Sequence, residues 1–112
     1  MSESNVWDLV VFGGGTAGLV ASRTAASFGS RVLLAEDNRL GGDCLWTGCV
    51  PSKSLIDAGD AATTARSSAR LGVTSSAVIV DFAQVMAHVQ DAMHEIAQSI
   101  PQSLWRWTTL RL

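Results

Sequence analysis

Residues 6–18 have the sequence VWDLVVFGGGTAG, in which a mostly apolar run passes directly into three consecutive glycines. The run is rich in Val and is broken at once by glycine, which is typical of a buried strand entering a tight turn. Residues 17–28 are rich in Ala and are followed by Gly29, a pattern that predicts a helix ending at a C-terminal glycine. A second short apolar run follows at residues 31–35. The order strand, glycine turn, helix, strand predicts a right-handed βαβ unit with two parallel strands.

The glycines of the turn follow the dinucleotide-binding pattern G-x-G-x-x-G at Gly13, Gly15 and Gly18. The first permits a tight turn, the second lets the backbone approach a pyrophosphate, and the third lets helix and strand pack closely. About twenty residues later Glu36 closes the second strand, where a carboxylate can accept hydrogen bonds from ribose hydroxyls. The alternative is an ordinary glycine turn with a solvated Glu36. The motif by itself does not distinguish NAD from FAD.

Two longer helices are expected after the βαβ unit. Pro51 suits the first turn of a helix that runs to about residue 70 and ends at Gly72. Asp81 is a suitable N-cap for a helix over residues 82–99. Helical spacing places one apolar face on this last helix. Its members are Phe82, Val85, Met86, Val89, Met93, Ile96 and Ile100. The predicted fold class is α/β, a Rossmann-like βαβ unit followed by helices.

Four residues separate Cys44 from Cys49. On an undistorted helix their Cα atoms would lie roughly 8 to 9 Å apart, whereas a disulfide requires less than about 7 Å. Gly48 and Pro51 are residue types that could distort this turn and bring the sulfurs together. At a helix start, Cys49 would meet the positive end of the helix dipole, which favours the thiolate. A redox-active pair is the preferred interpretation, and a structural disulfide is the alternative.

Zinc binding is a second alternative, because Cys44, Cys49, His88 and His94 form a Cys2His2 set. The spacing argues against it, since histidines six positions apart on one helix point about 120° away from each other. We therefore expect no metal site, and we expect both histidines at the surface or at the edge of the core.

Composition excludes several classes of partner. The chain has 112 residues, a formal net charge of −2 and 47% hydrophobic residues, as expected of one small globular domain. Lys and Arg occur singly, so no basic stripe is available for nucleic acid or an anionic membrane. The first residues form neither a signal peptide nor a membrane span. We expect a cytoplasmic protein with no nucleic-acid or membrane partner.

Residues 41–53, GGDCLWTGCVPSK, resemble the pattern G-G-T-C-x-N-x-G-C-[IV]-P-S-K of the class I pyridine nucleotide-disulfide oxidoreductases. This family includes dihydrolipoamide dehydrogenase, glutathione reductase and mercuric reductase. The resemblance extends over about residues 6–100. Two departures are Asp43 in place of Thr, and Trp46-Thr47 in place of an Asn-Val type pair. These favour the mercuric-reductase-like and dihydrolipoamide-dehydrogenase-like bacterial branch.

The resemblance implies a role for each matching residue. In the family a hydride passes from NAD(P)H to FAD, the flavin reduces a disulfide, and the dithiol reduces the substrate. Cys44 would be the interchange thiol, Cys49 the flavin-proximal thiol, and Lys53 a lysine near the flavin ring. The implied FAD-binding residues are Gly13, Gly15, Gly18, Glu36, Gly42 and Lys53. The substrate would be a small-molecule disulfide, a protein-bound disulfide or mercuric ion.

By the same resemblance, residues 1–100 would be a partial FAD-binding domain and residues 101–112 an unmatched tail. The second nucleotide motif and the interface domain would be missing, so we expect an N-terminal fragment of a larger enzyme. Such a fragment would be inactive alone, and a homodimer is expected only of the complete enzyme. Two alternatives remain open: a non-catalytic nucleotide-binding module, and a thiol protein that works without flavin.

Overall fold

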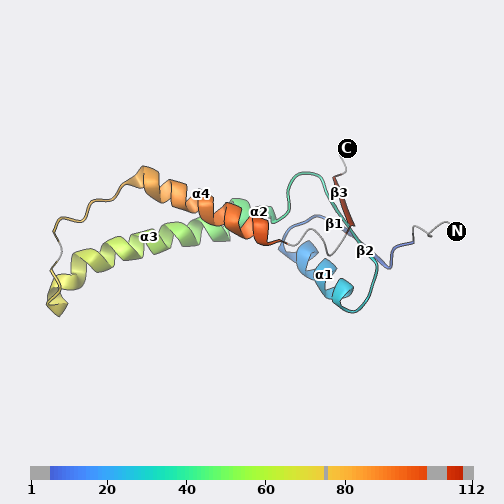
Figure 1. Ribbon diagram of the computed structural model, residues 1–112, viewed down its shortest axis with the longest axis horizontal. Helices are drawn as coiled ribbons and strands as arrows, with labels where there is room; N and C mark the ends of the chain where they lie inside the picture. Colours follow the sequence, from blue (N-terminus) through green and yellow to red (C-terminus); the bar gives the residue numbers. More distant parts are fainter. Residues whose placement is uncertain (1–5, 75, 101–105, 110–112) are drawn as a thin grey trace.

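A computed structural model describes residues 6–74, 76–100 and 106–109; for 106–109 only the backbone path is described. The molecule is elongated, with extents of 73 × 30 × 19 Å. Figure 1 shows a small sheet and helix α1 together at one end of the molecule, and a hairpin of helices α3 and α4 that extends away from them. Helix α2 lies where these two parts meet.

The sheet contains three parallel strands in the order β1-β2-β3. Strands β1 (Leu9–Phe12) and β2 (Val32–Glu36) are the two that the sequence predicts. Strand β3 (Arg106–Thr109) pairs with β2 and was not predicted. It falls within the tail expected at residues 101–112, of which 101–105 and 110–112 lie outside the described residues. The predicted α/β class and βαβ unit are confirmed, with one strand more than expected.

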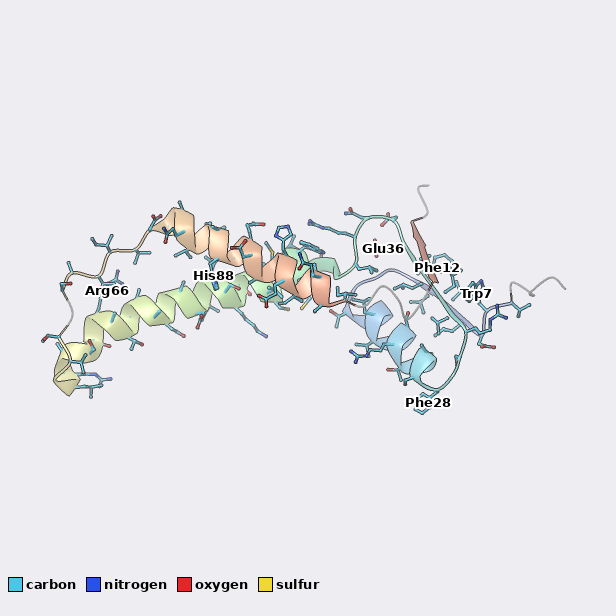
Figure 2. The ribbon with its side chains drawn as sticks, in the orientation of Figure 1. Trp7, Phe12, Phe28, Glu36, Arg66 and His88 are labelled. Atoms are coloured by element: carbon cyan, nitrogen blue, oxygen red, sulfur yellow. The ribbon has the colours of Figure 1, made fainter. Side chains whose placement is uncertain are left out.

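Helix α1 (Thr16–Ser27) covers one face of the sheet. This face carries Val32 and Leu34, both buried, and the fully buried Ser22 of α1 packs in the same layer. Alternation along β1 places Val10 and Phe12 on the opposite face, where they are 44% and 78% exposed. Figure 2 shows Phe12 at this sheet. Parallel sheets are usually covered on both faces, whereas the described residues cover only the α1 face of this sheet.

The remaining helices are α2 (Gly42–Trp46), α3 (Cys49–Ser67), the 3₁₀ turn η1 (Ser68–Leu71) and α4 (Phe82–Ser99). Gly72, with φ +81°, ends the α3–η1 segment as predicted. The predicted N-cap of α4 is also confirmed. Asp81 Oδ1 accepts hydrogen bonds from the backbone N–H groups of Ala83 and Gln84 at 3.0 and 3.1 Å.

The hairpin is held together by a small core where α2, α3 and α4 meet. Its buried members are Leu45, Val89 and Met93, and its partly buried members are Trp46, Val50, Ala97 and Ile100. The apolar face predicted for α4 is therefore buried only in part. Phe82 and Ile96 remain 64% and 43% exposed. At Phe82 the reason is visible in Figure 1, where α3 and α4 diverge toward the linker that joins them. Within the described residues, none of the helices is long and apolar enough to cross a membrane.

Candidate dinucleotide and redox-thiol site

The glycine turn between β1 and α1 requires glycine at two of its motif positions. Gly13 has φ +97°, and its N–H donates to the carbonyl of Ala35 at 2.8 Å. A side chain on Gly18 would strike the carbonyl oxygen of Gly13 and would lie 3.3 Å from Cγ1 of Val11. Gly18 therefore allows α1 to pack closely on β1, which is the role expected from the motif.

The amino end of α1 is open to an anion. Gly15 is the N-cap residue, with extended backbone, and no side chain within the described residues caps it. The first backbone bond of the helix runs from Leu19 N–H to the Gly15 carbonyl at 2.9 Å. The preceding N–H groups lack helical acceptors, and the first turn carries no acidic residue. This arrangement fits the pyrophosphate of a dinucleotide.

Glu36 lies directly beneath the glycine turn. Its Oε2 accepts the backbone N–H of Gly14 at 2.5 Å, and its Oε1 accepts that of Asn38 at 3.0 Å. These bonds, the Gly14 bond first, hold the pKa of the Glu36 carboxyl below its usual value. Figure 2 shows Glu36 at the end of the sheet nearest the hairpin. The predicted bond to a ribose hydroxyl remains a prediction. The two backbone bonds leave room for it, because each carboxylate oxygen retains a second lone pair.

Two further glycines attach the start of α2 to this turn. Gly41 donates its N–H to the carbonyl of Gly14 at 2.8 Å. A Cβ on Gly42 would lie 2.8 Å from the Cα of Gly15. Gly41 and Gly42 also have φ of +112° and +57°, a region that side chains disfavour. The predicted cofactor residue Gly42 therefore lies against the nucleotide turn, and the helix carrying Cys44 starts beside it.

The two cysteines lie on different helices. Helix α2 ends at Trp46, Gly48 has φ −123° and ψ −104°, and Cys49 opens α3. This break confirms the irregular helix start that a redox pair requires. Both cysteines are free thiols, Cys44 half-buried and Cys49 exposed. Cys44 and Cys49 flank the break between the two helices and influence each other's pKa.

The two thiols differ in acidity. The hydrogen bond from Cys49 lowers the pKa of Cys44, and hydrogen bonding by Thr16 and the positive charge of Lys53 act in the same direction. The same Cys44–Cys49 bond, together with the negative charge on Cys44, raises the pKa of Cys49. The expectation that the helix start favours a thiolate at Cys49 stays a prediction, because the two thiols influence each other's pKa.

Lys53, predicted to act at this site, lies one turn after Cys49 on α3 and is exposed. Its ammonium favours the thiolate form of both cysteines. The predicted contact between Lys53 and a flavin ring remains a prediction.

An apolar cavity of about 260 Å³ adjoins Cys44. Its lining comes from α1, the α2 region, α3 and α4. The residues are Thr16, Leu19, Val20, Gly41, Cys44, Leu45, Val50, Ile96 and Ile100. The sequence alone does not predict this cavity. Leu19 and Val20 lie within the predicted helix and Ile96 and Ile100 within the predicted apolar face, but their convergence depends on tertiary packing.

Trp46, a departure from the family pattern, ties α2 to its surroundings. Its Nε1–H donates to the carbonyl of Leu40 at 2.8 Å. The Arg39 guanidinium lies 4.0 Å from the centre of its ring, and the His94 ring meets it edge-on at 5.9 Å. The indole thus joins the loop after β2 to α4 and fixes the helix that carries Cys44.

Asp43, the other departure, is exposed, and its Oδ1 accepts a hydrogen bond from Thr47 Oγ1 at 3.4 Å. The carboxylate is thus engaged with the end of its own helix. This is consistent with the side chain turning away from a bound phosphate.

The histidines do not join the cysteines. His88 and His94 are both exposed on α4, as expected. Figure 2 shows His88 on the hairpin, well away from Glu36. Within the described part of the chain, no three His, Cys, Asp or Glu side chains are grouped to hold a metal ion.

The fold and site define a Rossmann-like βαβ unit joined to two short-linked helices, α2 and α3, that each carry one thiol. The chain belongs to the pyridine nucleotide-disulphide oxidoreductase family, whose sequence profile matches residues 7–104.

Curated relatives include several bacterial proteins named dihydrolipoyl dehydrogenase. One from Bacillus subtilis (strain 168) is 36% identical over 94 residues, which is 84% of this chain and 20% of the relative. A second from the same organism is 45% identical over 78 residues, covering 70% of this chain and 17% of the relative. One from Geobacillus stearothermophilus is 41% identical over 78 residues, with the same coverage. The chain therefore spans about a fifth of the length of these relatives.

Proposed function

We propose that this chain is the FAD-binding and redox-thiol part of a pyridine nucleotide-disulfide oxidoreductase. One observation carries the proposal. Gly41 and Gly42 pack against Gly14 and Gly15, so the paired thiols lie beside the turn suited to a dinucleotide. A glycine turn or a thiol pair alone would have many uses, whereas their attachment to each other favours electron transfer between a bound dinucleotide and the thiols.

In this proposal the α1 amino end binds the FAD pyrophosphate and Glu36 accepts from the adenosine ribose. Lys53 stabilises negative charge at the sulfurs. FAD, when bound, supplies two-electron chemistry between a reduced pyridine nucleotide and a disulfide. Cys44 and Cys49 form one S–S bond when two electrons and two protons leave them, and the reverse step returns two thiols. The position of the two thiols on either side of one helix break favours this exchange, because little rearrangement is needed.

The proposed electron donor is NADH or NADPH, and the proposed acceptor is a small-molecule or protein-bound disulfide. Two kinds of observation favour a disulfide over mercuric ion: the relatives named dihydrolipoyl dehydrogenase, and the apolar cavity beside Cys44. We further propose a cytoplasmic location and, for the longer protein of which this sequence would form a part, a homodimer. Because the sheet face that carries Phe12 is exposed among the described residues, we expect weak FAD binding by this chain alone.

The test uses the 112-residue chain and measures thiols and flavin separately. We expect two reactive thiols before oxidation by diamide and none afterwards, in a monomer whose mass shows an internal disulfide. Free FAD should lose fluorescence on titration with this protein and keep it with Gly18→Val, because the added side chain meets the Gly13 carbonyl. Gly59→Ala is the matched control, since a Cβ at Gly59 meets open space.

The two readouts separate the alternatives. Flavin binding without disulfide formation would leave a non-catalytic nucleotide-binding module. Disulfide formation without any flavin binding would leave a thiol protein. Neither result would be compatible with the proposed function.

A further inference from the structure

Trp46 lies between the two cysteines in the sequence and is the last residue of α2. Its Nε1–H donates to the carbonyl of Leu40 at 2.8 Å, and the guanidinium of Arg39 lies 4.0 Å from the centre of its ring. The ring of His94 on α4 meets the indole edge-on, with 5.9 Å between ring centres and 75° between ring planes. The indole therefore ties α2 to two segments that carry neither cysteine.

The residues that follow the two cysteines pack in one core. Leu45 follows Cys44 and is buried, and Val50 follows Cys49 and packs against the same cluster. Trp46 packs there as well. The backbone positions of the two cysteines are thus set by how α2 and α3 fit into this core.

Helix α2 depends on such tertiary contacts for its position. It has five residues, and no side chain within the described part of the chain caps its amino end. A helix this short is not stable by its own hydrogen bonds. The three contacts of Trp46 outside the helix are consequently a large share of what holds α2 in place.

We propose that Trp46 is a positioning residue that sets the redox equilibrium of the Cys44–Cys49 pair by holding α2 in one place relative to α3. The inference rests on the proposed function in taking these cysteines as a pair that forms a disulfide. Formation of the S–S bond passes two electrons and two protons to an oxidant and requires Cys44 to be within reach of Cys49. An anchored α2 has already lost much of the freedom that bond formation removes, so the anchored pair oxidises more readily.

The test measures the equilibrium between dithiol and disulfide in mixtures of oxidised and reduced glutathione. One oxidised glutathione takes up the two electrons and two protons and leaves as two thiols. Trp46→Ala should lower the equilibrium constant for disulfide formation about fivefold, and Arg39→Gln, which removes only the cation, about twofold. Trp46→Phe keeps the ring without the N–H donor and should fall between Trp46→Ala and the parent protein. Mass spectrometry after acid quenching and alkylation gives the fraction of each form.

Val32→Ala is the control for a general loss of stability, because Val32 is buried on the α1 face of the sheet. It should lower the free energy of unfolding in urea and leave the equilibrium constant unchanged. If Trp46→Ala is unfolded, Arg39→Gln still tests the proposal, since Arg39 is exposed.

Equal constants for the parent protein and the folded Trp46 and Arg39 variants would overturn the proposal, as would an equal fall in Val32→Ala. In both cases the parent chain still forms its disulfide, so the proposed function is unaffected. A parent chain that forms no disulfide would contradict the proposed function and this inference together.

Discussion

A Cβ atom on Gly42 would lie 2.8 Å from the Cα atom of Gly15, closer than real side chains approach a backbone. This contact joins the start of the Cys44 helix to the N-cap of α1. The dinucleotide turn and the thiol pair are therefore placed relative to each other by backbone, which is stiffer than side-chain packing.

Gly42→Ala should separate these two parts. The substitution meets both the Gly15 backbone and a positive φ of +57°, so we expect a loss of about 1 to 3 kcal/mol in the free energy of unfolding. Urea denaturation measures this loss. Gly59→Ala, inside α3 with open space around it, should instead be neutral or stabilise by up to about 1 kcal/mol. Equal stabilities for the two variants would contradict the importance of the contact.

The local parts of the fold could be predicted from sequence. The Gly13–Gly18 turn, the Asp81 cap and the Gly72 stop each depend on a few neighbouring residues, and all three occur as predicted. The third strand could not be predicted in the same way. Residues 106–109, RWTT, include residue types that favour strands, but the stretch is only four residues long and its pairing with β2 joins segments about seventy residues apart.

The candidate site likewise has features that could be predicted from sequence and features that could not. The motif positions Gly13, Gly15, Gly18, Glu36, Cys44 and Cys49 could be identified from spacing and resemblance. The docking of Gly42 on Gly15 and the acidity order of the thiols could not. Both depend on distances between side chains or backbones of separate elements, which spacing along the chain does not specify.

Ser22 provides a prediction about stability. Its hydroxyl is buried and, within the described part of the chain, hydrogen-bonds no other group. Burying an unsatisfied hydroxyl is unfavourable, and Ala has the higher helix propensity. Ser22→Ala should therefore raise the free energy of unfolding by about 1 kcal/mol. Thermal denaturation measures the change, with exposed Ser27→Ala as the control. A destabilised Ser22→Ala would reveal a hydrogen bond or packing role for this hydroxyl.

The lowered pKa of Glu36 leads to a prediction about how the free energy of unfolding depends on pH. The folded state lowers the pKa of this carboxyl, so near its ordinary value of 4.5 the unfolded chain binds more protons than the folded one. The stabilisation from Glu36 is present above pH 4.5 and is lost as the pH falls through the lower folded value. Since the group is half exposed, we expect Glu36→Gln to cost less than about 1 kcal/mol at neutral pH. The difference from the parent protein should shrink in acid.

Unfolding measured from neutral to acid pH tests this sign, with the exposed Glu95→Gln on α4 as the matched control. A Glu36→Gln deficit that grew as the pH fell would contradict the assigned hydrogen bonds.

The cysteine pair leads to an asymmetric prediction. Cys44 raises the pKa of Cys49 by hydrogen bonding and by its negative charge, whereas the bond from Cys49 lowers the pKa of Cys44. Cys44→Ser removes that charge, so Cys49 should react with iodoacetamide about threefold faster at neutral pH than in the parent protein. Cys49→Ala removes a donor, so Cys44 should react more slowly. Cys49→Ser retains an O–H donor and should fall between Cys49→Ala and the parent.

Lys53 provides the control for this pair, because its charge favours both thiolates and its effect should weaken at high salt. Lys53→Gln should therefore slow both cysteines without reversing their order. If Cys49 reacted more slowly in Cys44→Ser than in the parent protein, the thiolate would reside on Cys49 instead. The helix end would then dominate over the neighbouring sulfur, and the acidity order inferred from the structure would be reversed.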